Sequence, residues 1–265
     1  MTAIFDAHFH IFDPRFPAPG HGGYAPPTFT VAQYRAATAG LGVTGGVLVA
    51  ASTHGLDPVP LLAALEELGP GFVAVAAADP AMPEARLREL AARGVRGLRF
   101  NLYRGMVEDS PEAALDFADR AHAAAGLHAQ IYADAATLRP LLPRLRAMAG
   151  RLVIDHLGMT EAGLPVVLEL AAAGARVKAT GFGRVDLEVA PALERIAAVA
   201  PRALIFGTDL PSTRARRPFA PEDMALLRRI AGAAPFHENA AAFYGAAAHG
   251  REAALRSPGR HAPGR

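Results

Sequence analysis

Histidine and aspartate side chains stand at the ends of three short apolar runs in the sequence. His8 and His10 close the run IFDAHFH, His156 closes LVIDH, and Asp209 follows LIFGT. Imidazole and carboxylate groups can transfer protons, and they can also bind a divalent cation such as zinc. The 265-residue chain contains no cysteine, so thiolate metal ligands and cysteine nucleophiles are excluded.

A second group of polar residues is suited to binding a substrate. Cations outnumber acids in this group, which comprises Arg99, Arg104, Lys178 and Arg184 against Asp6 and Asp209. A guanidinium group binds a carboxylate through two parallel hydrogen bonds, so this surplus predicts a small substrate that carries carboxylate groups. Further hydrogen-bonding side chains near these positions are Tyr24, Ser52, His54 and Tyr132.

These residues need a scaffold that brings distant segments together, and the apolar pattern predicts one. Eight short runs rich in β-branched and small residues alternate with Ala-, Leu- and Arg-rich stretches, which is typical of a parallel sheet built from βα units. The expected strands are residues 4–10, 46–51, 72–78, 97–101, 128–132, 152–156, 177–180 and 204–207. The expected helices include residues 61–68, 84–93, 112–125, 137–148 and 191–199, and residues 219–244 supply the last helix and a closing one. The predicted fold class is α/β, a single (β/α)8 TIM-barrel domain over residues 1–250.

Alternation along the strands predicts which side chains face the barrel interior. In the first strand Asp6, His8 and His10 are expected to point inward, and Phe5, Ala7 and Phe9 to point outward. In later strands, three pairs of polar residues are expected to point inward: Arg99 and Asn101, Gln130 and Tyr132, and Lys178 and Thr180. The apolar residues expected to face outward are Leu98, Phe100, Ile131 and Val177. Active sites of such barrels lie at the carboxyl ends of the strands, so we expect a polar site there. Asp6 has a structural alternative, an ion pair with Lys178 or Arg99. The proline- and glycine-rich residues 14–27 are expected to form a wall or lid of the site.

The charge distribution argues against nucleic-acid binding. The net charge is +2, from 27 basic and 25 acidic residues, but residues 251–265 alone hold four arginines and one glutamate. The remaining body is close to neutral, unlike a nucleic-acid-binding domain. The sequence shows no membrane-spanning run and no signal-peptide pattern. We therefore expect a cytoplasmic enzyme without nucleic-acid or membrane partners, with residues 251–265 as a disordered basic tail; homo-oligomerisation is left open.

Taken together, these motifs resemble the amidohydrolase superfamily, in the TIM-barrel branch of metal-dependent hydrolases that includes lactonases and decarboxylases. The opening His-x-His, VIDHLG with His156, FGTDLP with Asp209 and the closing HENAAAFYG are similar to segments of that branch. Within it, DAHFHIFDPRFP, GYAPP, ASTHG, GLRFN, QIYAD and GFGRVD resemble the 2-pyrone-4,6-dicarboxylate lactonases. The resemblance implies that substrate carboxylates are bound by Tyr24, Ser52, Arg99, Arg104, Tyr132 and Arg184.

The predicted reaction is the hydrolysis of a carboxylate-bearing lactone. Asp209 takes a proton from water, and His8, His10 and His156 stabilise the charge that develops on the carbonyl oxygen. The resemblance implies that no cofactor is required; alternatively, these three histidines and Asp209 hold one divalent metal, Zn²⁺. Other activities stay open: a metal-dependent non-oxidative decarboxylase, a lactone isomerase, or a barrel that only binds an acidic ligand.

Overall fold

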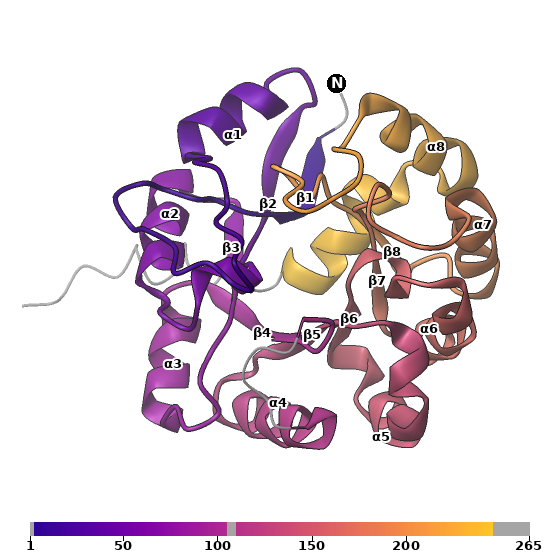
Figure 1. The fold of residues 1–265 in the computed structure, drawn as a ribbon. Coiled ribbons are helices and arrows are strands. Elements are labelled where there is room, and N and C mark those ends of the chain that lie inside the picture. The colour runs from indigo at the N-terminus through magenta and orange to yellow at the C-terminus, as the bar shows by residue number, and fades with distance from the viewer. Residues whose placement is uncertain (1–2, 105–109, 246–265) are drawn as a thin grey trace, which may run out of the picture.

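Eight parallel strands form a ring surrounded by helices in the computed structural model, which describes residues 3–104 and 110–245 (Figure 1). The strands follow chain order around the ring: β1 (Ile4–Phe9), β2 (Val43–Val49), β3 (Phe72–Ala76), β4 (Val95–Asn101), β5 (His128–Tyr132), β6 (Leu152–Ile154), β7 (Arg176–Ala179) and β8 (Leu204–Phe206). The helices are α1 (Val31–Thr38), α2 (Val59–Leu68), α3 (Glu84–Ala92), α4 (Pro111–Ala125), α5 (Leu142–Ala147), α6 (Leu164–Ala172), α7 (Val189–Val199) and α8 (Pro221–Ala231). The predicted (β/α)8 barrel is confirmed. The expected tail, residues 251–265, lies outside the described residues.

Local sequence signals explain several element boundaries. Helix α4 begins after Ser110, whose hydroxyl accepts a hydrogen bond from the amide of Ala113, and ends at Gly126, which has a left-handed φ of 67°. The expected helix at 137–148 is instead a 3-10 segment (Ala135–Leu141) followed by α5, because Pro140 cannot donate an α-helical hydrogen bond. Strand β6 ends two residues before the predicted end at residue 156.

Strand β1 contains a bulge that changes which residues face inward. Its register against β2 shifts between Asp6 and Phe9. Asp6 contacts Tyr34 of α1, whereas Phe5 and Ala7 pack among the valines of the barrel interior. The predicted directions of Asp6, Phe5 and Ala7 are therefore wrong, because one extra residue in a strand reverses its alternation. Beyond the bulge, the two histidines point inward and Phe9 outward, as predicted.

The ring closes between β8 and β1 through the side chain of Asp6. Its carboxylate accepts hydrogen bonds from the amide of Thr208 at 2.8 Å, from the hydroxyl of Thr208 at 2.7 Å and from the hydroxyl of Tyr34 at 3.0 Å. Gly207 lies so close to β1 that a Cβ there would come within 2.7 Å of the His8 nitrogen. Asp6 joins the two edge strands, and the expected ion pair with Lys178 or Arg99 is wrong.

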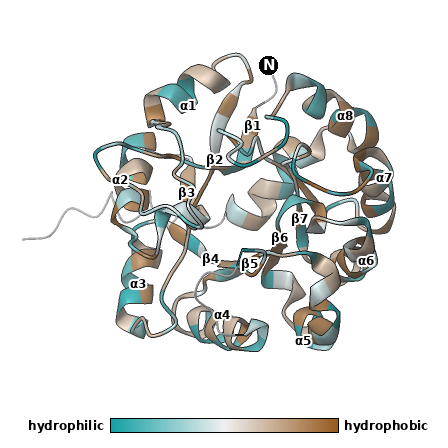
Figure 2. Ribbon diagram, in the orientation of Figure 1, coloured by the Kyte–Doolittle hydropathy of each residue, from teal (hydrophilic) through white to brown (hydrophobic). Residues whose placement is uncertain are grey.

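Two apolar layers surround and fill the barrel. Between strands and helices, the layer includes the four side chains predicted to face outward, Leu98, Phe100, Ile131 and Val177. Inside, valines of β2 and β3 pack with Tyr244 from a closing helix (residues 238–245), visible at the centre of Figure 1. Hydrophilic residues gather on the outer turns of the helices (Figure 2). Within the described residues, every helix is too short or too polar to cross a bilayer.

Candidate active site

The four predicted catalytic residues meet at the carboxyl end of the barrel. The imidazole ring centre of His8 lies 5.0 Å from that of His10 and 4.8 Å from that of His156. One carboxylate oxygen of Asp209, Oδ1, lies 3.7 Å from Nε2 of both His8 and His10. Among the described residues, Oδ1 of Asp209 and Nε2 of His8 and His156 are buried without a hydrogen-bond partner. Because unpaired buried polar atoms are costly, these atoms are candidates for contact with a water molecule, an ion or a ligand.

Backbone geometry fixes two of these side chains. Asp209 has a φ of 58° and His156 a φ of 48°, both in the left-handed region that non-glycine residues rarely adopt. The amide of Asp209 donates to the carbonyl of His8 at 2.7 Å, which locks the loop after β8 onto β1. Such backbone strain is maintained where the surrounding structure requires it, commonly at functional sites.

Asp209 is held in its charged form by a neighbouring arginine. Nε of Arg184 donates to Oδ2 of Asp209 at 2.9 Å, and Nη2 of Arg184 donates to the same oxygen at 2.5 Å. Burial opposes ionisation, but the charges of Arg184 and the neighbouring histidines hold the pKa of Asp209 well below its usual range. One oxygen of Asp209 is thus neutralised by Arg184, and the other faces the histidines.

The ring of His10 presents a lone pair to the site. Its Nδ1 donates to the carbonyl of Val49 at 2.8 Å, so in the neutral imidazole Nε2 carries no hydrogen. Burial lowers the pKa of His10, which favours this neutral form. Nε2 of His10 and Oδ1 of Asp209 are therefore two acceptors facing one another. A donor between them, such as water, or a cation would relieve this repulsion.

A buried charged network lies beneath the histidines. Lys178 is fully buried; its Nζ donates to Oε1 of Gln130 at 2.7 Å and lies 3.2 Å from Nδ1 of His8. Asp155, the neighbour of His156 in the chain, accepts from Nε of Arg99 at 2.9 Å and from Nε2 of Gln130 at 3.3 Å. The predicted inward directions of Arg99, Gln130 and Lys178 are thereby confirmed. Asp155 was not predicted to be a site residue, although it lies two residues after Val153, whose side chain faces the barrel interior.

Opposing charges explain the state of this network. Burial opposes ionisation of Asp155, but Arg99, His8 and Lys178 hold its pKa well below the usual value. Burial also lowers the pKa of Lys178 to about 7, with Asp155 acting in the opposite direction. Nδ1 of His8 also lies 3.4 Å from Oδ1 of Asp155. In the tautomer where Nδ1 accepts the hydrogen bond of charged Lys178, the proton of the neutral His8 ring is on Nε2, facing Asp209.

Next to His10 and His156 lies a pocket that, with its solvent-open mouth included, measures about 330 Å³. Its walls include all six residues predicted to bind substrate, namely Tyr24, Ser52, Arg99, Arg104, Tyr132 and Arg184. Tyr24 comes from the first βα loop, which thus forms part of the wall, as expected. The sequence did not single out Arg214, whose guanidinium carbon lies 4.4 Å from the ring centre of Tyr24. Burial and the nearby charge of Arg104 lower the pKa of Arg214, and none of the described residues lining the cavity is acidic.

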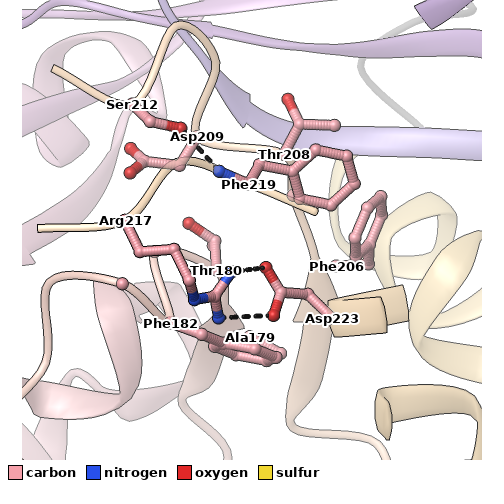
Figure 3. Close-up of a pocket in the computed structure, with 13 residues that line it drawn as sticks. Ala179, Thr180, Phe182, Phe206, Thr208, Asp209, Ser212, Arg217, Phe219 and Asp223 are labelled. Carbon is pink, nitrogen blue, oxygen red and sulfur yellow. Dashed lines mark hydrogen bonds and ion pairs between the residues drawn. The ribbon is translucent and has the colours of Figure 1, made fainter. Parts of the chain in front are cut away.

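A separate small pocket of about 280 Å³ lies on the other side of Asp209, between β7, β8 and the segment leading to α8 (Figure 3). Arg217 and Asp223 form an ion pair with a 2.7 Å contact in its wall. The hydroxyl of Ser212 accepts a hydrogen bond from the amide of Phe219 at 3.0 Å. These contacts hold the segment after Asp209 in place, and they thereby help to fix the position of the Asp209 carboxylate.

The donor set at this end of the barrel fits a divalent metal. Ligand atoms of His8, His10 and Asp209 lie within 4.8 Å of one another, and so do those of His8, Asp155 and His156. The unpaired buried atoms described above belong to the same side chains. Nitrogen and carboxylate ligands suit zinc, and the Nδ1 bond of His10 to a backbone carbonyl is the usual support of a metal-binding histidine.

Comparisons with known proteins cover nearly all of the chain. Residues 5–246 match the family model described as amidohydrolase. A 2-pyrone-4,6-dicarboxylate hydrolase of Comamonas testosteroni is 34% identical over 156 residues, an alignment that covers 58% of this chain and only 51% of that relative. A D-galactarolactone isomerase of Agrobacterium fabrum is 29% identical over 244 residues, covering 85% of this chain and 82% of the isomerase.

A solved structure shows the same fold. The crystal structure of a probable 2-pyrone-4,6-dicarboxylic acid hydrolase from Acinetobacter baumannii with citric acid bound has a TM-score of 0.76 to this protein, at 21% identity. The match covers 91% of this chain and 99% of the other. The barrel, the residues at its carboxyl end and the match over residues 5–246 lead to one assignment: this chain belongs to the amidohydrolase family.

Proposed function

We propose that this protein hydrolyses a small lactone that carries carboxylate groups, of the 2-pyrone-4,6-dicarboxylate kind. The observation that carries the proposal is the ionised Asp209 with one unpaired oxygen, set against imidazoles of which two, those of His10 and His156, line an arginine-rich cavity. Similarity to a 2-pyrone-4,6-dicarboxylate hydrolase supports the reaction class. Similarity to a lactone isomerase favours a second candidate, migration of the ester within the same class of substrate.

The arginines bind the substrate in this proposal. Arg104 and Arg214 line the cavity and repel one another, so a carboxylate between them would be stabilised. Nε and Nη1 of Arg99 are occupied by Asp155 and the carbonyl of Ala50, which keeps its guanidinium rigid beside the ring of Tyr132. These contacts would orient the lactone carbonyl toward the histidines.

Asp209 and the histidines divide the proton transfers. Oδ1 of Asp209, with the lone pair of His10 beside it, accepts a proton from water as the water oxygen bonds to the lactone carbonyl carbon. Nε2–H of His8 donates to the developing oxyanion. When the ring carbon–oxygen bond breaks, protonated Asp209 returns its proton to the leaving oxygen. The new carboxylic acid group then loses its proton to solvent, so the product is a ring-opened acid with one additional carboxylate.

His8, His10, His156 and Asp209 would hold a divalent metal if the enzyme uses one. A bound cation supplies polarisation of the carbonyl and a lower pKa for water. In our proposal the reaction does not require it, because a proton acceptor and an oxyanion donor are both provided by side chains.

The Asp209→Asn variant tests the proposal. A panel of carboxylated lactones, including 2-pyrone-4,6-dicarboxylate, would be followed by ring opening, proton release and product identification. Loss of the general base should lower kcat by roughly 10²-fold or more. The matched control is Asp116→Asn, which removes a carboxylate from a solvent-exposed ion pair on α4 and should leave kcat unchanged.

Several outcomes would contradict parts of the proposal. Full activity in Asp209→Asn would show that the assigned mechanism is wrong. Release of carbon dioxide would identify a decarboxylase, and a rearranged lactone would identify an isomerase. Metal analysis of the same sample before and after chelation decides the cofactor: activity that disappears with the metal and returns on zinc addition would show that the metal is required.

A further inference from the structure

The first βα loop carries a short hairpin beside the cavity that His10 and His156 line. His21 and Tyr24 pair through two backbone hydrogen bonds, each amide donating to the carbonyl of the other residue, at 3.0 and 3.1 Å. The two glycines between them have φ values of 56° and 73°, the left-handed conformation that such a two-residue turn requires. The 21–24 hairpin therefore places Tyr24, which lines the cavity, at a defined point of the loop.

One side of the 21–24 hairpin is attached to the loop after β2. The amide of Gly20 donates to the carbonyl of Thr53 at 3.2 Å. A Cβ at Gly55 would come within 3.2 Å of the Pro19 ring, so the two loops are in close contact there. The two-glycine turn itself is solvent-exposed and has no side chains with which to pack. A segment with so few side-chain contacts opens easily unless a further contact secures it.

The further contact comes from Arg214, in the loop after β8. Nη2 of Arg214 donates to the carbonyl of His21. The guanidinium carbon of Arg214 also lies 4.4 Å from the ring centre of Tyr24, in a cation–π arrangement. One side chain thus contacts both residues that pair in the hairpin, and it joins the loop after β1 to the loop after β8.

The backbone of Arg214 is itself held in place. Its φ of 59° lies in the left-handed region, which a non-glycine residue keeps only where its surroundings require it. The residues on both sides are anchored: the carbonyl of Thr213 accepts from Nη2 of Arg184 at 3.1 Å, and the amide of Arg216 donates to the carbonyl of Gly183 at 2.9 Å. Arg214 therefore extends from an anchored segment toward a hairpin that has few contacts of its own.

We propose that Arg214 is a positioning residue: it holds the 21–24 hairpin against the cavity and thereby fixes Tyr24 where it contacts the substrate. A guanidinium has five N–H donors, so the bond to His21 leaves others for a substrate carboxylate. The same side chain would then bind the hairpin and the substrate together. The contact with the hairpin is independent of the reaction, whereas the effect on substrate binding rests on the proposed function.

Hydrogen exchange of the free protein, followed by mass spectrometry, tests the hairpin contact without any substrate. In Arg214→Gln, amide exchange of residues 20–24 should become at least fivefold faster, because the hairpin loses both contacts with the guanidinium. Arg104→Gln is the matched control: it removes a cation from the same cavity, but its guanidinium lies over Tyr103, so exchange at residues 20–24 should not change. Arg214→Lys should keep most of the protection, because an ammonium can still donate to a carbonyl and lie over the Tyr24 ring.

Kinetics with 2-pyrone-4,6-dicarboxylate test the effect on substrate binding. Arg214→Gln should raise KM at least fivefold without lowering kcat, because Asp209 and the histidines are unaltered. A double-mutant cycle with Tyr24→Ala shows whether Arg214 acts through Tyr24. The rise of KM in the double variant should be smaller than the product of the two single effects, because the hairpin no longer carries the ring that Arg214 positions.

Three results would overturn the proposal. The first is equal exchange at residues 20–24 in Arg214→Gln and the parent protein. The second is exchange of these amides in the parent at the rate of an unstructured peptide. The third is a rise of KM in the double variant equal to the product of the single effects, which would mean that Arg214 binds substrate independently of the hairpin.

Two other outcomes are also decisive. If no lactone is turned over, the proposed reaction is wrong, and the exchange measurement alone decides whether Arg214 holds the hairpin. If Arg214→Gln does not fold, judged by its thermal unfolding, Tyr24→Leu takes its place. That variant removes only the ring beneath the guanidinium, and unchanged exchange at residues 20–24 would then overturn the proposal.

Discussion

Arg184 lies where it can bind either of two carboxylates, that of Asp209 or one on a bound substrate. In this structure both of its contacting nitrogens bind Oδ2 of Asp209. A substrate carboxylate in the adjoining cavity would compete for the same guanidinium. As Arg184 turns toward the substrate, the negative charge of Asp209 is less neutralised, and its affinity for a proton rises. In the proposed reaction, this would couple substrate binding to activation of Asp209 through one side chain.

The Arg184→Met variant separates these two effects. Loss of the guanidinium should raise KM for a carboxylated lactone about tenfold or more, by removing a charged hydrogen bond. It should also raise the pKa of Asp209, because the main stabilising charge is lost, so the acidic limb of the pH profile of kcat moves to higher pH. The control Arg104→Met should raise KM without moving that limb. An unmoved limb in Arg184→Met would contradict the coupling.

At the scale of elements, closure of the barrel depends on contacts between its first and last strands. Thr208 donates two hydrogen bonds to Asp6, and the amide of Asp209 reaches the carbonyl of His8. The carboxylate proposed as the general base thus directly follows a structural junction. Its position relative to the histidines depends on that junction.

The Thr208→Val variant measures the strength of this junction. Valine keeps the shape of the side chain but removes the 2.7 Å hydrogen bond, leaving the buried carboxylate of Asp6 with one fewer donor. We expect the free energy of unfolding in urea to fall by about 1–3 kcal/mol. Thr137→Val, at an exposed position, should change it by less than about 0.5 kcal/mol. Equal losses in the two variants would argue against a special role for the junction.

Strand β1 shows how far sequence patterns predict such elements. Alternation correctly placed His8, Arg99, Gln130 and Lys178 inside the barrel, because side-chain direction along a regular strand has a period of two. It failed at Asp6, because a bulge is set by pairing with a distant strand rather than by local sequence. The ion pair of Arg184 with Asp209 could not be predicted either, since rotamers follow from contacts between loops.

At the scale of the whole molecule, buried histidines make stability sensitive to acid. Burial lowers the pKa of His128 to about 3, of His156 to about 3 and of His54 to about 4, and it also lowers the pKa values of His8 and His10. The unfolded chain takes up these protons near pH 6.5, whereas the folded chain does not. The stabilising contribution is complete above pH 6.5 and is lost progressively as the pH falls toward 3.

His128→Gln tests this dependence away from the catalytic residues. Glutamine does not titrate, so Tm should fall less between pH 7 and pH 4.5 in the variant than in the parent protein. His122→Gln, at a solvent-exposed position on α4, should retain the steeper dependence of the parent. Differential scanning calorimetry across this pH range provides the measurement. Identical slopes in all three proteins would refute the assignment of acid sensitivity to buried His128.

The closing helix has a consequence for turnover in the proposed reaction. Tyr244 and Ala240 pack inside the barrel, while the proposed active-site cavity, lined by His10, His156 and several arginines, opens at the carboxyl end of the strands. Reactant and product would therefore enter and leave through the same opening of the cavity. The product would leave past the same arginines that bind the reactant. Because opening a lactone ring adds a negative charge, these arginines would bind the product more strongly than the reactant. Product release, rather than cleavage of the ring, would then limit kcat.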